Sequence, residues 1–166
     1  MQKFYITTSI PYANAAPHIG FALEAVQADV LARYHKSLGE NVFYLTGTDE
    51  HGLKIKKTAE EIGKTPQEFV NEISARFEEL TKSLNISNDD FIRTTEERHK
   101  LAVEKLWKKI KKDIYKKKYK GYYCSGCEAF VTEKDLIEGK CPIHKRNQSL
   151  LKKKTISLGF LNIWMK

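Results

Sequence analysis

The sequence lacks an apolar segment long enough to cross a membrane. No run in its 166 residues approaches the roughly 18 apolar positions that a spanning helix needs. The first residues, MQKFYI, lead directly into a strand-like run, without the apolar core and small-residue cleavage site of a signal peptide. Internal repeats are also missing. We therefore expect no membrane span, no export and a cytoplasmic location.

Cysteine is scarce, and an odd number without a secretion signal argues against a disulfide framework. Two residues separate Cys124 from Cys127, and two residues separate Cys141 from His144. Two such tight turns supply four ligands that suit tetrahedral zinc. Four protein ligands leave no open coordination position, so the predicted site is structural. The plainer alternative is three free cysteines and an unrelated histidine.

Acidic residues are outnumbered, with 21 Asp and Glu against 29 Lys and Arg and a net charge of +8. Nine of the lysines lie between Lys105 and Lys120. Such a positive field favours a polyanionic partner. A solvated helix face explains the same lysines without any partner, and the sequence leaves both interpretations open.

The length suits one domain with a core and a small appendage. β-branched and aromatic runs predict strands, and apolar residues at every third or fourth position predict helices. Their alternation is the order of a parallel α/β sheet with crossover helices. The expected strands are Phe4–Ile10, Asn41–Thr46 and one that begins over Phe91–Arg93, and the expected helices are Ile19–Leu38, a short one ending at Ile62, Thr65–Leu84 and Thr95–Asp113.

Two of these helices have a readable apolar stripe. The expected helix Thr65–Leu84 begins with Thr65 as N-cap, Pro66 at the first helical position and Glu68 in an acidic first turn. The apolar face of Ile19–Leu38 comprises Ile19, Leu23, Val26, Val30, Tyr34 and Leu38. The expected core face of Thr65–Leu84 comprises Phe69, Ile73, Phe77, Leu80 and Leu84.

Two loops follow predicted strands at the edge where ligands of open α/β sheets bind. The first leads into a helix N-terminus, which offers free N–H groups and a positive dipole end to an anion. There His18 could donate to phosphate oxygens, and Gly20 lets a nucleotide approach the backbone. In the second loop Asp49 could hold a cationic amine. On spacing alone, a turn with an incidental histidine is the plainer explanation of the first loop, and an ordinary N-cap explains Asp49 in the second loop equally well.

Four segments together resemble the N-terminal part of methionyl-tRNA synthetase, a class I aminoacyl-tRNA synthetase. They are "PYANAAPHIGF", "QADVLARYHKSLGENVFYLTGTDEHGLKI", "DDFIRTTEERH" and "GYYCSGCEAFVTEKDLIEGKCPIH", in the family's own order. The resemblance implies a Rossmann-type (HUP-like) parallel sheet with crossover helices, of which residues 1–114 form the first half. Residues 115–151 correspond to the start of the family's zinc-binding connective insert.

The implied activity is that of an aminoacyl-tRNA ligase, which makes methionyl-adenylate from methionine and ATP and transfers the methionyl group to tRNA(Met). By resemblance, Ile10 and Tyr12 help form the methionine site and Asp49 binds the substrate ammonium. His18, Gly20 and Phe21 belong to the ATP site, Mg²⁺ accompanies the departing pyrophosphate, and Zn²⁺ occupies the cysteine site.

Two positions depart from the family pattern. By resemblance, residues 18–20 (HIG) correspond to the start of the HIGH signature of class I synthetases. Phe21 stands where that signature has its second histidine, which puts one phosphate or ribose contact in doubt. Ala15 stands where many members have glycine, which restricts positive φ in the loop. We interpret both as variation within the family.

Two alternative functions remain. A nucleotidyltransferase with an HxGH loop would explain the first loop, but neither TDEHG nor the cysteine pairs. A non-catalytic, zinc-bearing tRNA-binding fragment would explain the lysines and the metal site. The family continues for several hundred residues beyond this sequence and includes the lysine-rich KMSKS loop, so we expect a fragment with negligible aminoacylation on its own.

The resemblance stops at Lys152–Lys154, and TISLGFLNIWMK follows. With suitable codons, the same stretch read in a shifted frame gives NYFFRLSKYLDE, which resembles the family at this place. We hypothesise a base gained or lost in the adenine run that encodes the lysines, so that residues 152–166 form an out-of-frame tail. Sequencing the DNA across that run tests the hypothesis.

Overall fold

The computed structural model describes residues 2–158 except 125, 128 and 146–148, and over 117–120 and 149–158 it describes the backbone alone. Contacts divide the chain into two compact units, Met1–Val103 and Glu104–Lys166. The division falls inside a helix, upstream of the boundary expected at residue 114. Each unit has a three-stranded sheet of its own.

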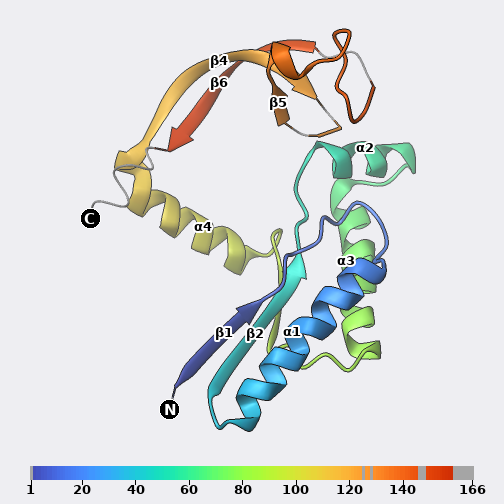
Figure 1. Cartoon of the computed structure of the whole chain (residues 1–166), viewed down its shortest axis with the longest axis vertical. Coiled ribbons are helices and arrows are strands. Elements are labelled where there is room, and N and C mark those ends of the chain that lie inside the picture. Colours follow the sequence, from blue (N-terminus) through green and yellow to red (C-terminus); the bar gives the residue numbers. More distant parts are fainter. Residues whose placement is uncertain (1, 125, 128, 146–148, 159–166) are drawn as a thin grey trace. The chain divides into compact units, whose positions relative to one another are not determined.

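The first unit is a parallel sheet with strand order β1-β2-β3, and helices connect its strands (Figure 1). This arrangement confirms the predicted α/β pattern. β1 ends at Thr7 rather than Ile10; just beyond it the N–H of Thr8 still donates to the Leu45 carbonyl of β2, and the N–H of Ser9 donates to Glu24 of α1. The elements are β1 (Lys3–Thr7), α1 (Ile19–Ser37), β2 (Asn41–Thr48), α2 (Leu53–Glu61), α3 (Pro66–Ser83), β3 (Asp90–Arg93) and the start of α4 (Glu97–Ile110).

α1 buries a different face from the stripe of large apolar residues seen in the sequence. Ile19 and Val30 from that stripe are 86% and 60% exposed. The buried side chains of α1 include Ala28 and Ala32, which pack in one cluster with residues of β1 and β2. Alanine lets the helix backbone approach the sheet closely, so small size and not hydrophobicity selects the face. The amphipathic stripe exists, but it is not the core face.

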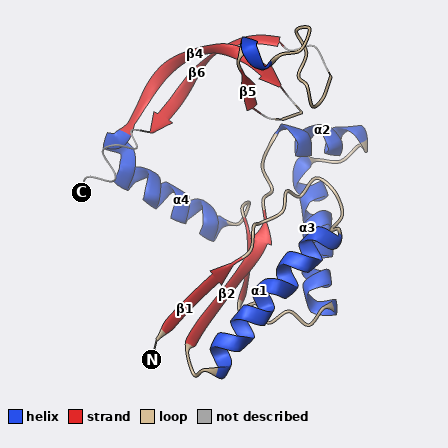
Figure 2. Cartoon of the chain, viewed as in Figure 1, coloured by secondary structure: helices blue, strands red, loops and turns tan. Residues whose placement is uncertain are grey.

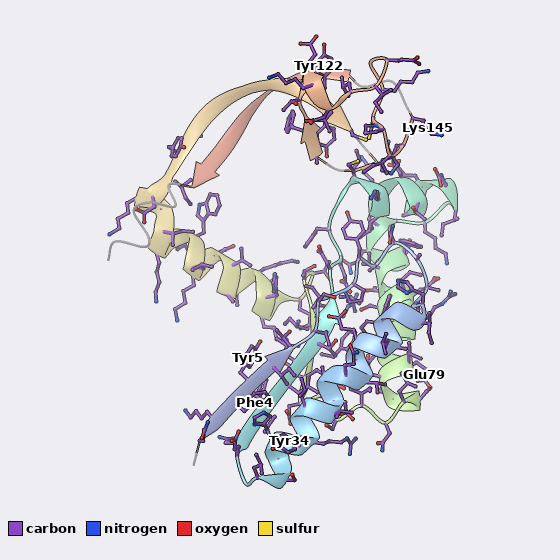
Figure 3. The ribbon with its side chains drawn as sticks, viewed as in Figure 1. Phe4, Tyr5, Tyr34, Glu79, Tyr122 and Lys145 are labelled. Carbon is purple, nitrogen blue, oxygen red and sulfur yellow. The ribbon has the colours of Figure 1, made fainter. Side chains whose placement is uncertain are left out.

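The sheet alternates between a packed face and an exposed one, as the period of a β-strand requires. Phe4 and Ile6 of β1 pack against the cluster that contains Val42 of β2. Tyr5, which lies between them and is labelled in Figure 3, is 60% exposed and stacks on Phe43 with ring centroids 6.0 Å apart. The α1 side of the sheet therefore carries the core.

α3 supplies more of the buried residues in the second core cluster than any other element that the structure describes. Its predicted residues Phe69, Ile73 and Phe77 are buried, and Leu80 packs against them. Leu84 is 39% exposed, so its assignment to the core face was wrong; α3 ends at Ser83 and Leu84 is only its C-cap. The predicted helix start is confirmed as a capping box, in which the Thr65 hydroxyl accepts from the Glu68 N–H and the Glu68 carboxylate accepts from the Thr65 N–H.

A buried carboxylate fastens α1 to the chain that leads into β3. Asp29 accepts hydrogen bonds from the N–H and hydroxyl of Ser87, both at 2.6 Å, and from Nε of Arg33 at 2.6 Å. Burial alone would raise the pKa of Asp29, but the bonds from Ser87 and Arg33 outweigh it and hold the pKa below its ordinary value. Tyr44 lies nearby, and its pKa is raised to about 12, chiefly by burial and further by the negative charges of Asp29 and Glu24.

The second unit is an antiparallel sheet of order β5-β4-β6 (Figure 2). It contains β4 (Ile114–Cys124), β5 (Ala129–Val131) and β6 (Ser149–Leu158). β4 and β6 pair at ten successive positions, from Ile114 opposite Leu158 to Tyr123 opposite Ser149. The backbone of 155–158 thus lies in a strand, although the sequence assigned it to a tail outside the family pattern; 159–166 lie outside the described residues. Within the described part of the chain, no helix has the length and apolarity to span a membrane.

Candidate functional site

Backbone hydrogen bonds join the two candidate loops at the carboxyl ends of β1 and β2. The N–H of Asp49 donates to the carbonyl of Pro11 at 2.9 Å, and the N–H of Ala13 donates to the carbonyl of Asp49 at 2.8 Å. Tyr12 and Asp49 consequently form a parallel bridge beyond the end of the regular strands. The parallel sheet thus brings together two residues that the sequence assigned to one substrate.

His18 begins α1 and caps it with its own ring. Its Nδ1 accepts a hydrogen bond from the N–H of Gly20 at 3.0 Å, so the neutral ring carries its proton on Nε2. A Cβ at Gly20 would lie 2.7 Å from the His18 ring and displace it, so the cap requires glycine there. The ring is exposed, and its Nε2–H is left to donate outward beside the positive end of the helix.

A cavity of about 330 Å³ opens beside this helix start. Four of the predicted site residues, Tyr12, His18, Gly20 and Phe21, line it. Ile10 and Asp49 are half-buried but do not belong to its wall. The complete lining is Ser9, Pro11, Tyr12, Asn14, Ala15, Ala16, His18, Gly20, Phe21, Glu24 and Phe77.

Phe21 combines a place in the cavity wall with a place in the core. Its side chain is 4% exposed and meets Phe77 of α3 edge to face, with ring centroids 4.9 Å apart. Such a pair contributes about 0.5–1.5 kcal/mol beyond the area that it buries. The ring that replaces the second histidine of the HIGH signature therefore stabilises the contact between α1 and α3.

The second loop holds a buried carboxylate that the sequence analysis did not single out. Glu50 accepts from Arg93 in a bidentate pair, with Nε at 2.6 Å and Nη2 at 3.1 Å, and its side chain is fully buried. Hydroxyl groups of Thr48 and Thr95 donate to the same carboxylate. Because the carboxyl ends of parallel strands lie at one edge of the sheet, Arg93 at the end of the third strand could have been predicted to lie near Glu50.

The environment of Glu50 keeps it ionised. Burial alone would raise the pKa of Glu50, but the hydrogen bonds from Arg93, Thr95 and Thr48 outweigh that penalty and hold the pKa below its ordinary value. Its backbone N–H donates to the Thr94 hydroxyl at 2.8 Å, which in turn donates to Asp49 at 3.4 Å. Glu50 therefore anchors the loop in which Asp49 presents its carboxylate.

Gly52 ends this loop because no other residue fits. Its φ of +137° is a conformation that residues with a Cβ rarely adopt, and a Cβ there would lie 1.5 Å from the Tyr12 hydroxyl oxygen. The Tyr12 ring of the first loop thus lies directly over the start of α2. Contacts between side chain and backbone thereby add to the hydrogen bonds that join the two loops.

The second unit gathers all four predicted metal ligands. Cys124, Cys127, Cys141 and His144 place one ligand atom each within 4.8 Å of one another. The Cys127 and Cys141 sulfurs are 3.6 Å apart, and Nδ1 of His144 lies 3.3 Å from Sγ of Cys127 and 3.7 Å from Sγ of Cys124. Zinc bond lengths of about 2.3 Å to sulfur and 2.0 Å to nitrogen predict tetrahedron edges of about 3.5–3.8 Å. With Nδ1 of His144 4.0 Å from Sγ of Cys141, these separations run from 3.3 to 4.0 Å and bracket the expected edges, and the donor set fits Zn²⁺.

Hydrogen bonds among the thiols of this cluster shift their pKa values in opposite directions. The hydrogen bond with Cys141 raises the pKa of Cys127 to about 11, whereas the N–H of Cys127 donates to Sγ of Cys124 and lowers the pKa of that thiol. Sulfurs this close cannot all ionise without a positive charge between them. All three cysteines are free, and Cys124 and Cys141 are buried.

The profile of one protein family, the class I tRNA synthetases (M), matches residues 4–155. The chain belongs to the class I methionyl-tRNA synthetase family. The match covers the parallel sheet, both candidate loops and the cysteine cluster. It confirms the resemblance on which the predicted fold rests.

Relatives with known sequence or structure agree with this family. The methionine–tRNA ligases of Thermotoga maritima and Clostridium acetobutylicum are 50% and 51% identical to the chain over 150 and 143 residues, which cover 87% and 85% of it. The structure of Mycobacterium tuberculosis methionyl-tRNA synthetase in complex with methionyl-adenylate superposes with a TM-score of 0.87 at 35% identity, covering 96% of this chain and 32% of that one. The chain spans about a quarter of the length of these curated relatives, 24% and 22%.

Proposed function

We propose that the two joined loops form part of the methionine and ATP site of a methionine–tRNA ligase. The observation that carries the proposal is the bridge between Tyr12 and Asp49, next to a helix start where His18 donates outward. The relative from Mycobacterium tuberculosis binds methionyl-adenylate, the product of the activation step. The reaction is ATP-dependent activation of methionine, followed by transfer to tRNA(Met) during translation in the cytoplasm.

In this proposal Asp49 pairs with the methionine ammonium, and Ile10 and Tyr12 shape the pocket around the substrate. Asp49 suits the role because the hydrogen bonds that its carboxylate accepts, from the Thr94 hydroxyl at 3.4 Å and the His51 N–H at 3.5 Å, are long. A cation therefore finds carboxylate oxygens with spare acceptor capacity. Glu50 contributes by holding this loop in place and not by touching the substrate.

The nucleotide lies against His18, Gly20 and Phe21 in the same proposal. The methionine carboxylate attacks the α-phosphate, a new P–O bond forms, and pyrophosphate leaves. His18 Nε2–H and the N–H groups at the start of α1 stabilise negative charge on the phosphate oxygens in the transition state. Mg²⁺, when bound, neutralises charge on the departing pyrophosphate. The remaining catalytic effect is positioning of the two substrates.

The cysteine cluster is proposed to hold a structural Zn²⁺. Cys124, Cys127, Cys141 and His144 would supply all four ligands, which leaves no position for a substrate. The spacing of their ligand atoms supports this assignment. Zn²⁺ held by these four residues would fix the fold of the second unit and would take no part in adenylate formation.

Binding of a non-hydrolysable methionyl-sulfamoyl-adenosine, measured by isothermal titration calorimetry, tests the proposed site. Asp49→Asn should weaken binding by about tenfold to a hundredfold, because it removes a charge-assisted hydrogen bond. His18→Ala should weaken it by a similar factor. Glu79→Gln makes the same acid-to-amide change on the exposed surface of α3 (Figure 3) and should leave affinity unchanged. Equal affinities for Asp49→Asn and Glu79→Gln would contradict the proposal.

A further inference from the structure

Glu24 of α1 closes the first loop at its base. Its Oε1 accepts a hydrogen bond from the N–H of Ser9 at 2.6 Å, and its Oε2 accepts one from the Ser9 hydroxyl at 2.7 Å. Ser9 lies just beyond the end of β1, and Glu24 lies in the second turn of α1. One side chain thus ties the chain that leaves the sheet to the helix that follows the loop.

The segment between Ser9 and Glu24 contains all the residues assigned to the proposed methionine and ATP site except Asp49. These residues are Ile10, Tyr12, His18, Gly20 and Phe21. Asp49 is joined to the same segment by its backbone hydrogen bonds with Pro11 and Ala13. The Ser9–Glu24 pair therefore closes a ring of chain that carries the site, and closure of a ring reduces the number of conformations available to it.

The ring has little freedom elsewhere. Pro11 and Pro17 each fix one φ angle. At the start of α1, Nδ1 of His18 accepts from the N–H of Gly20 at 3.0 Å. In a segment restricted in this way, the positions of its two ends determine where the middle lies. Release of Glu24 should consequently displace the whole first loop and not a single residue of it.

The Ser9–Glu24 pair also lies where a bound ligand meets it. Ser9 and Glu24 both line the cavity of about 330 Å³ to which Tyr12 and His18 contribute. Both hydrogen bonds are exposed, so water competes for them and they add little to the free energy of unfolding. A carboxylate at this place also repels the phosphate that the proposed function brings to the cavity. Stability alone therefore does not account for a glutamate here, whereas the two donors of Ser9 do.

We propose that Glu24 is a positioning residue for the methionine and ATP site, which holds the first loop through Ser9 and touches neither substrate. This inference rests on the proposed function and adds to it a residue that acts on the geometry of the site. A carboxylate suits the task because its two oxygens accept from the N–H and the hydroxyl of one serine at once. Glutamine can also pair with both groups, since its amide oxygen accepts from the N–H and its NH₂ group donates to the hydroxyl oxygen. Alanine can form neither bond.

Hydrogen–deuterium exchange of the full chain without ligand tests whether the pair holds the loop. Glu24→Ala should accelerate exchange of the amides of residues 10–20 by about tenfold, because the loss of two hydrogen bonds makes local opening easier. Exchange in β2 should stay unchanged, whereas a residue that only stabilised the fold would alter exchange there as well. Glu79→Ala removes a carboxylate from the exposed surface of α3 (Figure 3) and is the matched control, which should change neither region.

Calorimetry with methionyl-sulfamoyl-adenosine tests the consequence for binding. Glu24→Ala should weaken affinity by about tenfold, and Glu24→Gln should retain most of the natural affinity. Ser9→Ala removes only the hydroxyl and should weaken affinity by a smaller factor, which keeps the proposal testable if Glu24→Ala does not fold. The double variant should bind no more weakly than Glu24→Ala alone, because the two side chains act as one unit.

Three results would overturn the proposal. Equal exchange of residues 10–20 in Glu24→Ala and Glu79→Ala would show that the pair does not hold the loop. Equal affinities of Glu24→Gln and Glu24→Ala, both weaker than the natural chain, would assign the effect to charge and not to the contact with Ser9. Additive losses in the double variant would show that the two side chains act separately. A natural chain that does not bind the analogue would contradict the proposed function, while exchange, which needs no ligand, still decides whether Glu24 holds the loop.

Discussion

Replacing Glu50 by glutamine should lower the free energy of unfolding of the first unit by about 3 kcal/mol. The Glu50 carboxylate is fully buried and receives two hydrogen bonds from Arg93, with donor distances of 2.6 and 3.1 Å. Breaking a buried ion pair by removing one partner costs about 3–5 kcal/mol. The lower value applies because the Arg93 side chain is 26% exposed and water reaches it. Urea unfolding followed by far-UV circular dichroism measures the difference.

Two variants sharpen this measurement. Glu79→Gln on the surface of α3 should change stability by less than about 0.5 kcal/mol. The double variant Glu50→Met with Arg93→Met removes both charges at once and should recover most of the loss, because no uncompensated charge stays buried. A loss below about 1 kcal/mol for Glu50→Gln, or a double variant as unstable as the single one, would refute the reasoning.

The pH dependence of this effect has a definite sign. The folded-state pKa of Glu50 lies below its ordinary value of 4.5, so the folded state favours the ionised form. Its contribution to stability is fully present above about pH 4.5 and is lost as pH falls through the folded pKa. The stability gap between the natural chain and Glu50→Gln should therefore shrink in acid. A gap that stays constant from neutral pH to pH 3 would show that Glu50 is not the titrating anchor.

Three more substitutions follow from contacts in the structure. Gly52→Ala should lower the free energy of unfolding in urea by at least about 2 kcal/mol, since its Cβ would lie 1.5 Å from the Tyr12 hydroxyl oxygen. Gly63→Ala, which has a φ of +69° but open space around it, should lower it by about 1 kcal/mol. Equal losses would be inconsistent with the Tyr12 contact. In native mass spectrometry the chain should carry one zinc ion, which His144→Asn should abolish and His99→Asn, outside the cluster, should retain. Retention by both variants would remove His144 from the ligand set. Phe21→His should destabilise the chain by about 2 kcal/mol, because it buries a polar ring and loses the edge-to-face pair with Phe77, and a thermal shift upward would contradict this.

Elements of the first unit could be predicted because local signals and tertiary packing agree there. The Thr65 to Glu68 capping box and the strand-helix alternation specify α3 and the parallel sheet directly. The buried face of α1 could not be read from periodicity, because the large apolar residues form a better stripe than the alanines that pack on the sheet. Residue size decides which face approaches a sheet, and a hydrophobicity pattern does not report it.

The candidate site was predictable to a similar extent. The parallel-strand rule anticipates that loops after neighbouring strands meet, and the bridge between Tyr12 and Asp49 agrees with it. The spacing of Cys124, Cys127, Cys141 and His144 was sufficient to predict the cluster. The role of Glu50 escaped prediction because its partner Arg93 is 43 residues away in sequence, and only the strand order brings the two together.

The bridge between Tyr12 and Asp49 has a consequence for the order and cooperativity of ligand binding. Because two backbone hydrogen bonds join the loops, restricting the motion of one loop should also restrict that of the other. A ligand that reduces the motion of one loop would therefore reduce that of the other, and a second ligand would lose less conformational entropy when it binds. Two small molecules bound on the separate loops would each raise the affinity for the other, with no change in the average position of any atom.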